Sequence, residues 1–347
     1  MTSSSTLTSL PIVDFSLLGG SEEDIATFRE QLRTITHEIG FFYLVGHGIS
    51  QERMSEYVRV SRLFFELPEE EKLTLENTNS PHFRGYTRVG GEYTRGQVDW
   101  REQLDIGRER VALDSTLFPE DYWNLIGPNQ WPKSLPQLRE ITELWIDDLS
   151  QIAQRLLSEW AVSLGAPADV FADSFDERAE PLLKVVRYPG KSEGDSKQGV
   201  GIHKDAGILT LLYVEEGKAG LQVEYDGAWI DAPPVEGAFV VNIGEMLEIA
   251  TGGYLKATLH RVISPEVGTD RVSIPFFYQP RLDAEIPHIE LAEEFRAKSR
   301  GVEQDPNNVL HPVFGENILK SRVRAHPNVV EAHHPHLASA GAKAGAY

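Results

Sequence analysis

The residues with the clearest chemical potential are His203, Asp205 and His260. In extended backbone, residues i and i+2 point to the same face, so the side chains of His203 and Asp205 can bind one ion. His260 follows 55 residues after Asp205, at the end of the run Gly-Tyr-Leu-Lys-Ala-Thr-Leu-His (253–260). Two histidines and one carboxylate form the facial triad that holds non-haem Fe(II) and leaves coordination positions open. Each residue alone has an ordinary structural explanation, but the set predicts a mononuclear metal site.

A second group of residues predicts a receptor for a carboxylate. Arg271 and Ser273 lie two residues apart in a strand-like run that begins 11 residues after His260. A guanidinium fork and a hydroxyl on one strand face are good donors for a carboxylate. Tyr188, which precedes Pro189, offers a third donor from another strand. Alone, the arginine and the serine would indicate no more than a salt bridge and a hydroxyl on a strand.

The composition excludes several classes of protein. The formal net charge of −20 over 347 residues argues against a broad nucleic-acid surface and against a polybasic membrane surface, both of which need basic patches. The chain has no cysteine, so thiolate nucleophiles, cysteine-ligated zinc and iron–sulfur clusters are excluded. The absence of cysteine also fits a reducing compartment. We therefore expect a cytoplasmic protein that binds neither nucleic acid nor membrane, and the oligomeric state stays open.

The N-terminal residues do not have the pattern of a secretory signal. Residues 1–10 are polar and rich in serine, and they lack the cationic start and apolar centre of a secretory signal. No run of about 18 apolar residues is present, so no membrane span is expected. The tail contains five histidines, and we expect them to face solvent for the most part.

The elements that must position these residues fall into two halves. Helices are predicted over 22–39, 50–65 and 136–164, where apolar residues recur every three or four positions. Residues 77–101 show no clear period, and we expect a long loop or irregular hairpin that covers a site. Many short strands at close spacing in the second half indicate a sandwich or jelly roll. We expect them at 182–188, 208–214, 221–225, 229–230, 238–243, 260–263 and 271–278.

These motifs together resemble a known family. The chain is similar to the isopenicillin N synthase-like group of Fe(II)/2-oxoglutarate-dependent dioxygenases. The first half carries the resemblance at 10–15, 40–49 and 64–72. The second half carries it at His-Lys-Asp (203–205), at 241–253, at His-Arg-Val (260–262) and at 271–277. The resemblance implies a mainly β, α+β fold, whose core is a double-stranded β-helix (a distorted jelly roll) with flanking helices and a helical N-terminal module.

The resemblance also implies an organisation of the chain. We expect an N-terminal module over 1–135, a long backing helix and connection over 136–180, the oxygenase β-core over 181–310 and a C-terminal tail over 311–347. It implies Fe(II) on His203, Asp205 and His260, which would be the catalytic centre. It further implies that Arg271, Ser273 and Tyr188 bind the distal carboxylate of 2-oxoglutarate.

The implied activity is the oxidation of a small-molecule substrate with O2, with hydroxylation as the expected outcome and with succinate and CO2 released. Two departures from the family pattern are Lys204 in the middle of His-Lys-Asp and the Val186-Arg187 pair before Tyr188. Neither departure removes a ligand. The form Arg187-Tyr188-Pro189 is closer to the penicillin-forming oxidases, which keep the arginine and the serine yet use no 2-oxoglutarate. An Fe(II) oxidase of that type is therefore the first alternative.

Two further alternatives come from other classes of protein. A non-catalytic jelly-roll binding protein could keep the fold, and a zinc hydrolase could use the same three ligands. The intact triad argues against the first, and the arginine–serine pair has no evident role in the second. The candidates for contact with substrate are Arg84, Tyr86, Arg95, Lys204 and Phe277. Each of them could instead be a surface or structural residue.

Overall fold

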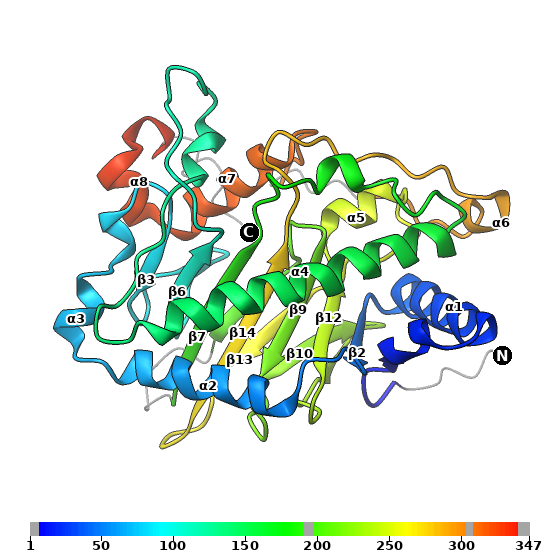
Figure 1. Cartoon of the computed structure of the whole chain (residues 1–347), viewed down its shortest axis with the longest axis horizontal. Helices are drawn as coiled ribbons and strands as arrows, with labels where there is room; N and C mark the ends of the chain where they lie inside the picture. Colours follow the sequence, from blue (N-terminus) through cyan, green and yellow to red (C-terminus); the bar gives the residue numbers. More distant parts are fainter. Residues whose placement is uncertain (1–6, 191–197, 303–307, 339–347) are drawn as a thin grey trace.

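A computed structural model describes residues 7–190, 198–302 and 308–338 of the chain. Two β-sheets form the centre, and helices cover the outer face of the larger one (Figure 1). This arrangement is the predicted double-stranded β-helix, with helices on its flank. No described helix has the length and apolar character needed to span a membrane.

The larger sheet has eight strands, all antiparallel to their neighbours except β1 and β2. The strands from the first third of the chain lie at its two edges. In spatial order they are β1 (Ile12–Asp14), β2 (Phe41–Val45), β12 (Phe239–Ile243), β9 (Leu209–Val214), β14 (Asp270–Tyr278), β7 (Leu182–Pro189), β6 (Glu102–Gly107) and β3 (Gly85–Thr87).

The smaller sheet faces the larger one and has four antiparallel strands. In order they are β11 (Ala228–Asp231), β10 (Leu221–Tyr225), β13 (His260–Ile263) and β8 (Gln198–His203). A separate short hairpin pairs β4 (Tyr93–Thr94) with β5 (Gln97–Val98). This hairpin lies within the segment 77–101, which the sequence predicts as an irregular hairpin.

The two faces of the larger sheet have different tasks because side chains alternate along each strand. In β14, the even positions Val272, Ile274, Phe276 and Tyr278 are buried in the main hydrophobic core. The odd positions face the other way and line a cavity between the sheets, and they are Arg271, Ser273, Pro275 and Phe277. One strand therefore supports the core and also presents the predicted carboxylate receptor.

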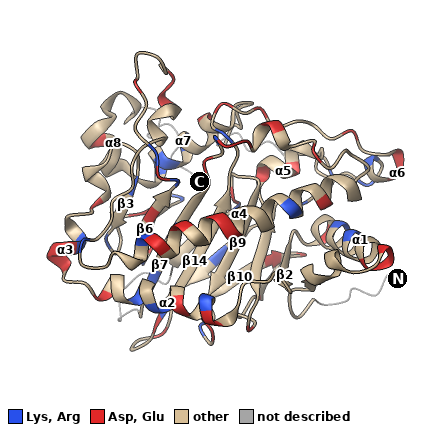
Figure 2. Cartoon of the chain, viewed as in Figure 1, with Lys and Arg blue, Asp and Glu red and all other residues tan. Residues whose placement is uncertain are grey.

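The helices pack mainly against the core face (Figure 1). They are α1 (Glu22–Glu38), α2 (Gln51–Glu66), α3 (Glu69–Leu73), α4 (Gln137–Ser163), α5 (Glu245–Ala250), α6 (Glu293–Arg296), α7 (Phe314–Ala325) and α8 (Pro327–His333). Trp145 and Trp160 of α4 are fully buried and anchor that helix to the sheet. Charged residues of both signs lie along the outer helices (Figure 2). These elements fix the sheet rigidly enough to hold a site on its opposite face.

The start of each long N-terminal helix follows from its capping residues. The Ser21 hydroxyl accepts a hydrogen bond from the Asp24 backbone N–H, and the Asp24 carboxylate accepts one from the Ser21 N–H. This reciprocal pair is a capping box, which satisfies backbone donors that a helix end leaves open. The Ser50 hydroxyl caps α2 by accepting from the Arg53 N–H. Both caps agree with the predicted helix starts.

Three features differ from the sequence expectations. The sequence also indicates strands at 10–15 and 41–45 and a possible strand at 99–107, which correspond to β1, β2 and β6, whereas β3 at 85–87 was not expected. Strand β8 lies at 198–203, where no strand was expected, and helix α5 follows β12 directly. The expectation that the tail histidines mostly face solvent is wrong for His326 and His334, which are buried where α7 and α8 pack back against the body of the protein.

Candidate metal centre and co-substrate pocket

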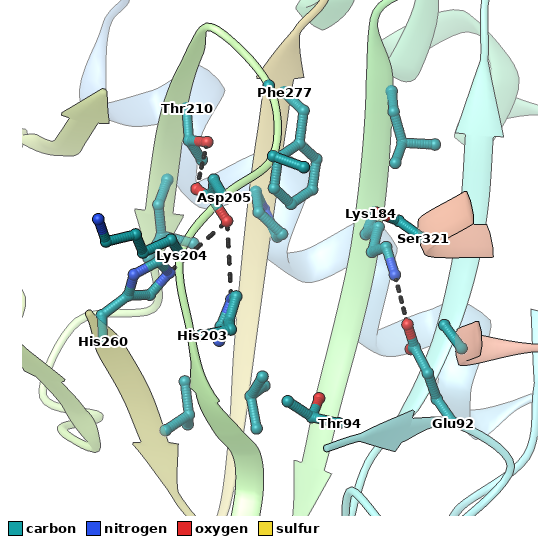
Figure 3. Close-up of a pocket in the computed structure, with 18 of the residues that line it drawn as sticks. Glu92, Thr94, Lys184, His203, Lys204, Asp205, Thr210, His260, Phe277 and Ser321 are labelled. Atoms are coloured by element: carbon teal, nitrogen blue, oxygen red, sulfur yellow. Dashed lines mark hydrogen bonds and ion pairs between the residues drawn. The ribbon is translucent and has the colours of Figure 1, made fainter. Parts of the chain in front are cut away.

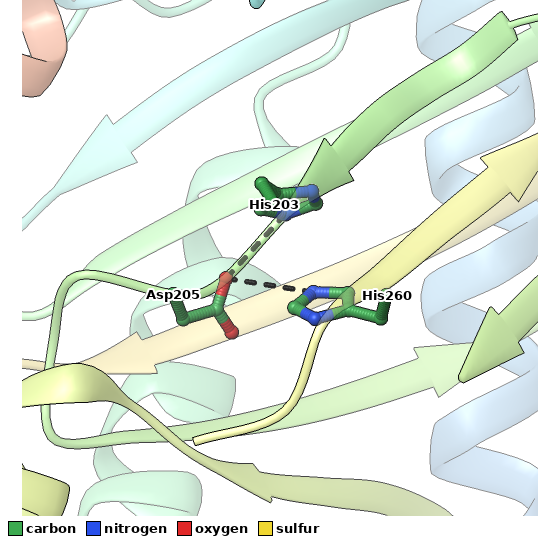
Figure 4. Close-up of side chains that lie close together, drawn as sticks. All are labelled: His203, Asp205 and His260. Atoms are coloured by element: carbon green, nitrogen blue, oxygen red, sulfur yellow. Dashed lines mark ion pairs between the residues drawn. The ribbon is translucent and has the colours of Figure 1, made fainter. Parts of the chain in front are cut away.

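The three predicted metal ligands meet at one end of the smaller sheet. His203 ends β8 and His260 begins β13, and the two residues are direct partners in the antiparallel register. Asp205 follows two residues after His203, so its carboxylate lies between the two imidazoles (Figure 4). The Oδ1 atom of Asp205 is 3.6 Å from Nε2 of His203 and 3.7 Å from Nε2 of His260. One ligand atom from each residue thus lies within 4.8 Å of the others.

Hydrogen bonds fix which atom of each side chain faces the centre. The Nδ1 atoms of His203 and His260 lie 2.8 and 3.1 Å from the carbonyl oxygens of Gly201 and Thr258. A carbonyl can only accept, so each Nδ1 carries the proton and each Nε2 keeps a lone pair that faces Asp205. Such outer partners of metal-binding histidines set the tautomer and the ring orientation.

The carboxylate of Asp205 is oriented in the same way. Its Oδ2 atom accepts hydrogen bonds from the Thr210 hydroxyl at 2.6 Å and from the Asn242 side-chain amide at 2.8 Å. Both donors come from strands of the larger sheet, β9 and β12. Oδ1 is left to face the two Nε2 atoms, so the arrangement presents three ligand atoms to a common point. Sequence reasoning missed Thr210 and Asn242 because their contact with Asp205 depends on the pairing of distant strands.

The electrostatics keep the side chains of Asp205 and His260 in the forms that bind metal. Burial lowers the pKa of His260 to about 4, so its imidazole is neutral at pH 7. Burial raises the pKa of the Asp205 carboxyl, but the imidazoles of His260 and His203 and the hydrogen bond from Asn242 lower it by more. The net pKa of Asp205 therefore lies well below the ordinary range, and the side chain is an anion. Two imidazole nitrogens and one carboxylate oxygen suit a divalent first-row metal.

Arg271 lies on the wall of the cavity and lacks an anion among the described residues. Its side chain is 1% exposed, and burial lowers the pKa of its guanidinium because it disfavours the charged form. Nη1 donates to the Ser273 hydroxyl at 3.2 Å, and the guanidinium carbon lies 4.8 Å from the ring centre of Tyr188. Nε and Nη2 have no hydrogen-bond partner in the part of the chain that the structure describes.

The surroundings of Arg271 show whether the distal carboxylate of 2-oxoglutarate fits there. A buried guanidinium with two unpaired donors is costly unless an acceptor occupies its place, and a carboxylate can bridge such a fork with two parallel bonds. Tyr188 and Arg271 are direct partners in the register of β7 and β14, which places the predicted clamp residues side by side. The residues present therefore fit both a divalent metal and the distal carboxylate of 2-oxoglutarate.

The triad and the clamp line one cavity of about 440 Å³, within the range for sites that bind small molecules. Figure 3 shows Phe277 between the triad on one side and Lys184 and Glu92 on the other. Three of the predicted substrate residues line this cavity, and they are Arg95, Lys204 and Phe277. Arg95 lies in the turn of the β4–β5 hairpin, so the segment 77–101 contributes to the wall.

The other two predicted substrate residues lie elsewhere. Arg84 is buried and donates to the carbonyl of Leu125 at 3.1 Å. The Tyr86 hydroxyl donates to Glu102 at 2.6 Å, on the opposite face of β6 from the cavity. Neither side chain lines the cavity, so a contact with substrate has no support from the geometry. Both residues help to hold the segment before the hairpin in place.

Comparisons with known proteins agree with this site. The family model for the non-haem dioxygenase N-terminal region in morphine synthesis matches residues 10–134, and the model for the 2OG-Fe(II) oxygenase superfamily matches residues 179–280. A "2-oxoglutarate-dependent dioxygenase frbJ" from Dothideomycetidae sp. (strain 11243) is 38% identical over 344 residues, which covers 93% of this chain and 91% of the relative. A homoarginine-6-hydroxylase from Arabidopsis thaliana is 33% identical, with 90% of this chain and 96% of the relative covered.

Solved structures include proteins of the same fold with the co-substrate bound. A full-length Neurospora crassa protein, crystallised in complex with alpha-KG and thymine, superposes with a TM-score of 0.73 and 27% identity, over 90% of this chain and 96% of that one. The relatives and the solved structure each cover at least 90% of this chain, and this chain covers at least 91% of each of them. Together with the triad and the clamp, they show that this chain belongs to the Fe(II)/2-oxoglutarate-dependent dioxygenases of the isopenicillin N synthase-like group.

Proposed function

We propose that His203, Asp205 and His260 hold the Fe(II) ion of this oxygenase and that it hydroxylates a small molecule in the cavity beside them. The carbon to be oxidised would lie near the triad, with Phe277 packed against the substrate. The relatives support a small-molecule substrate, since one is named for homoarginine and one solved structure contains thymine. A cytoplasmic location stays a prediction from the absence of cysteine.

We also propose that Arg271, Ser273 and Tyr188 bind the distal carboxylate of 2-oxoglutarate. The observation that carries this assignment is the buried Arg271 guanidinium with two unpaired donors on the wall of the triad's own cavity. The Ser273 hydroxyl supports the guanidinium from the same strand face.

The chain's own residues would contribute binding, orientation and exclusion of water. Iron with 2-oxoglutarate and O2 supplies the oxidation of a substrate C–H bond, coupled to the conversion of 2-oxoglutarate to succinate and CO2. Thr210 and Asn242 keep one oxygen of Asp205 away from the metal position. The apolar odd positions of β14, Pro275 and Phe277, line the same cavity as the clamp. The protein thus sets the geometry in which the co-substrate reacts.

The experiment is a turnover assay with labelled 2-oxoglutarate. The wild-type protein with Fe(II) and O2 should release succinate and CO2 slowly without substrate, as an uncoupled reaction. His203→Ala should release none while it keeps the wild-type melting temperature to within a few degrees. Succinate formation that survives in His203→Ala would remove this residue from the metal centre.

A further inference from the structure

The cavity extends past the triad and the clamp to a wall of three cations. This cationic wall consists of Arg101, Lys184 and Arg322, which all line the cavity and are each less than 10% exposed. The three residues come from the segment before β6, from β7 and from α7. Neither the metal centre nor the 2-oxoglutarate clamp uses them. Figure 3 shows Lys184 on the far side of Phe277 from the triad.

The strand pattern places these cations on the cavity side. Asp105 of β6 and Lys184 of β7 are direct partners in the register, and Arg101 lies an even number of residues before Asp105. Residues 101, 103 and 105 therefore share the face of the sheet that carries Lys184. Glu102 has the opposite orientation and pairs with Lys72 on the other face. The alternation of side chains thus places Arg101 and Lys184 on the cavity side, and α7 adds Arg322.

Carboxylates hold the cations in place. Glu92 accepts a hydrogen bond from Lys184 at 2.9 Å and pairs with Arg101 at 3.0 Å. Asp105 pairs with Arg322 at 2.9 Å and with Lys184 at 3.4 Å. Asp105 does not line the cavity, so the positive ends of its two partners lie between it and the cavity. Asp99 pairs with Arg101 at 3.1 Å and also does not line the cavity. Of the three carboxylates that pair with the wall, only Glu92 lines the cavity beside the three cations.

The cavity is cationic in an acidic protein. The whole chain has 53 acidic and 33 basic residues, whereas the described residues that line the cavity include seven Lys or Arg and three Asp or Glu. Fe(II) and the dianion 2-oxoglutarate cancel each other's charge, so they do not account for this excess. Arg101 adds a further sign of a missing acceptor, since its Nε is buried without a hydrogen-bond partner in the described parts of the chain. An enclosed positive surface attracts and orients an anion.

We propose that the substrate carries a carboxylate and that Arg101, Lys184 and Arg322 bind it at the cationic wall. This inference rests on the proposed function, because it concerns the substrate of the same site. The carboxylate would anchor one end of the molecule, and the other end would reach past Phe277 to the triad. The oxidised carbon is then remote from the carboxylate rather than adjacent to it. An uncharged molecule of the same shape would lack the charge-assisted hydrogen bond to the unpaired Nε donor of Arg101 and would bind more weakly.

The test compares carboxylic acids with their primary amides, which keep the shape and remove the charge. The probes are amino acids and aliphatic and aromatic acids, each beside its amide. Binding is measured by calorimetry on the Fe(II) protein without oxygen and at saturating 2-oxoglutarate, so that Arg271 is already occupied. We expect at least one acid to bind about tenfold or more tightly than its amide, as the loss of a charge-assisted hydrogen bond implies. If no pair shows a preference for the acid, the inference is wrong.

A matched pair of variants assigns the preference to the wall. Lys184→Met should remove most of the difference between acid and amide. Lys72→Met should leave it unchanged, because Lys72 is a comparably buried lysine with a carboxylate partner, Glu102, but does not line the cavity. An acid preference that persists in Lys184→Met, or that Lys72→Met removes equally, contradicts the role of the wall. Melting curves check that both variants fold. The comparison of acids with amides on the wild-type protein does not depend on either variant.

Substrate-free succinate release by the same wild-type preparation separates the two proposals. Succinate formed with no preference for acids overturns the carboxylate inference alone. No succinate under any condition overturns the proposed function as well.

Discussion

Replacement of Arg271 by methionine should separate binding from stability. The guanidinium is fully buried, and two of its donors lack a partner among the described residues. A residue that serves packing costs stability when it is replaced. The replacement of a residue that serves to bind a ligand should change stability little and lower the affinity for that ligand strongly. We therefore expect Arg271→Met to fold as well as the wild type and to bind 2-oxoglutarate poorly.

The magnitudes follow from the contacts of the side chain. The change removes a cation–π contact with Tyr188, worth about 0.5–2 kcal/mol, and a hydrogen bond to Ser273, worth about 1 kcal/mol. It also removes unpaired buried donors, which cost about 1–3 kcal/mol. These contributions oppose each other, so the free energy of unfolding without ligand should change by less than about 1 kcal/mol. The loss of two charge-assisted bonds to a carboxylate, about 1.5–3 kcal/mol each, should weaken 2-oxoglutarate binding by about 10²-fold or more.

The assay is an anaerobic calorimetric titration of the Fe(II) protein with 2-oxoglutarate, combined with urea unfolding of the ligand-free protein. Arg62→Met is the matched control, because Arg62 has carboxylate partners in Glu215 at 2.6 Å and Asp270 at 3.1 Å. That variant should lose stability and keep its affinity for 2-oxoglutarate. The reasoning is refuted if Arg271→Met loses more than about 3 kcal/mol of stability while its affinity falls less than about threefold.

Three further predictions concern the surroundings of the site. Asn242→Ala removes one of the two hydrogen bonds to Oδ2 of Asp205 and should weaken Fe(II) binding by about 10–100-fold in an anaerobic competition with a chelator; unchanged affinity would contradict this role. A Cβ at Gly244 would lie 2.2 Å from the carbonyl oxygen of Gly207 and 2.8 Å from that of Asp205. Gly244→Ala should therefore lower both the melting temperature and the affinity for iron, and a variant that loses neither would contradict this prediction. His326 is buried and neutral because burial lowers its pKa to about 4, below the ordinary value of about 6.5. The unfolded state therefore binds more protons between these values, and stability should fall by up to ~3 kcal/mol as pH drops from 6.5 to 4; urea unfolding of His326→Gln should show a flatter pH dependence, and an equal slope would contradict the assignment.

Much of the β-core could be predicted from the sequence because its signals are local. Short β-like runs at close spacing indicated the strands β9, β10 and β14 close to their observed bounds. The spacing of His203, Asp205 and His260 indicated the metal ligands, since i and i+2 in extended backbone share a face. The structure adds that His203 and His260 are paired across two strands.

Strand β8 was not predicted because glycine at two positions is typical of a loop. The structure gives a reason for those glycines. A Cβ at Gly199 would lie 2.9 Å from the Tyr188 ring, and one at Gly201 would lie 2.8 Å from Thr94. Close approach of other side chains, rather than a turn, therefore explains the glycines in this strand. Single-sequence patterns do not report such approaches.

The cationic wall also lay beyond the sequence analysis. Its members come from residues 101, 184 and 322, and only the fold of β6 and β7 against α7 brings them together. A signal was present in the polar residues at 101, 103 and 105, while Glu102 between them faces the other side of β6. Buried charge at alternate positions is unusual unless partners or a ligand compensate it. The partners of such residues, however, are set by tertiary structure.

The most direct test of the central claim is Fe(II) titration without oxygen, followed by 2-oxoglutarate, in the wild type and in two histidine variants. We expect one iron per chain and the weak visible charge-transfer band of the chelate in the wild type. His260→Ala should show no band. His47→Ala should keep the band, because His47 is also buried but bonds to the Gly237 carbonyl away from the cavity. A band of full strength in His260→Ala, or none in the wild type, would contradict the account.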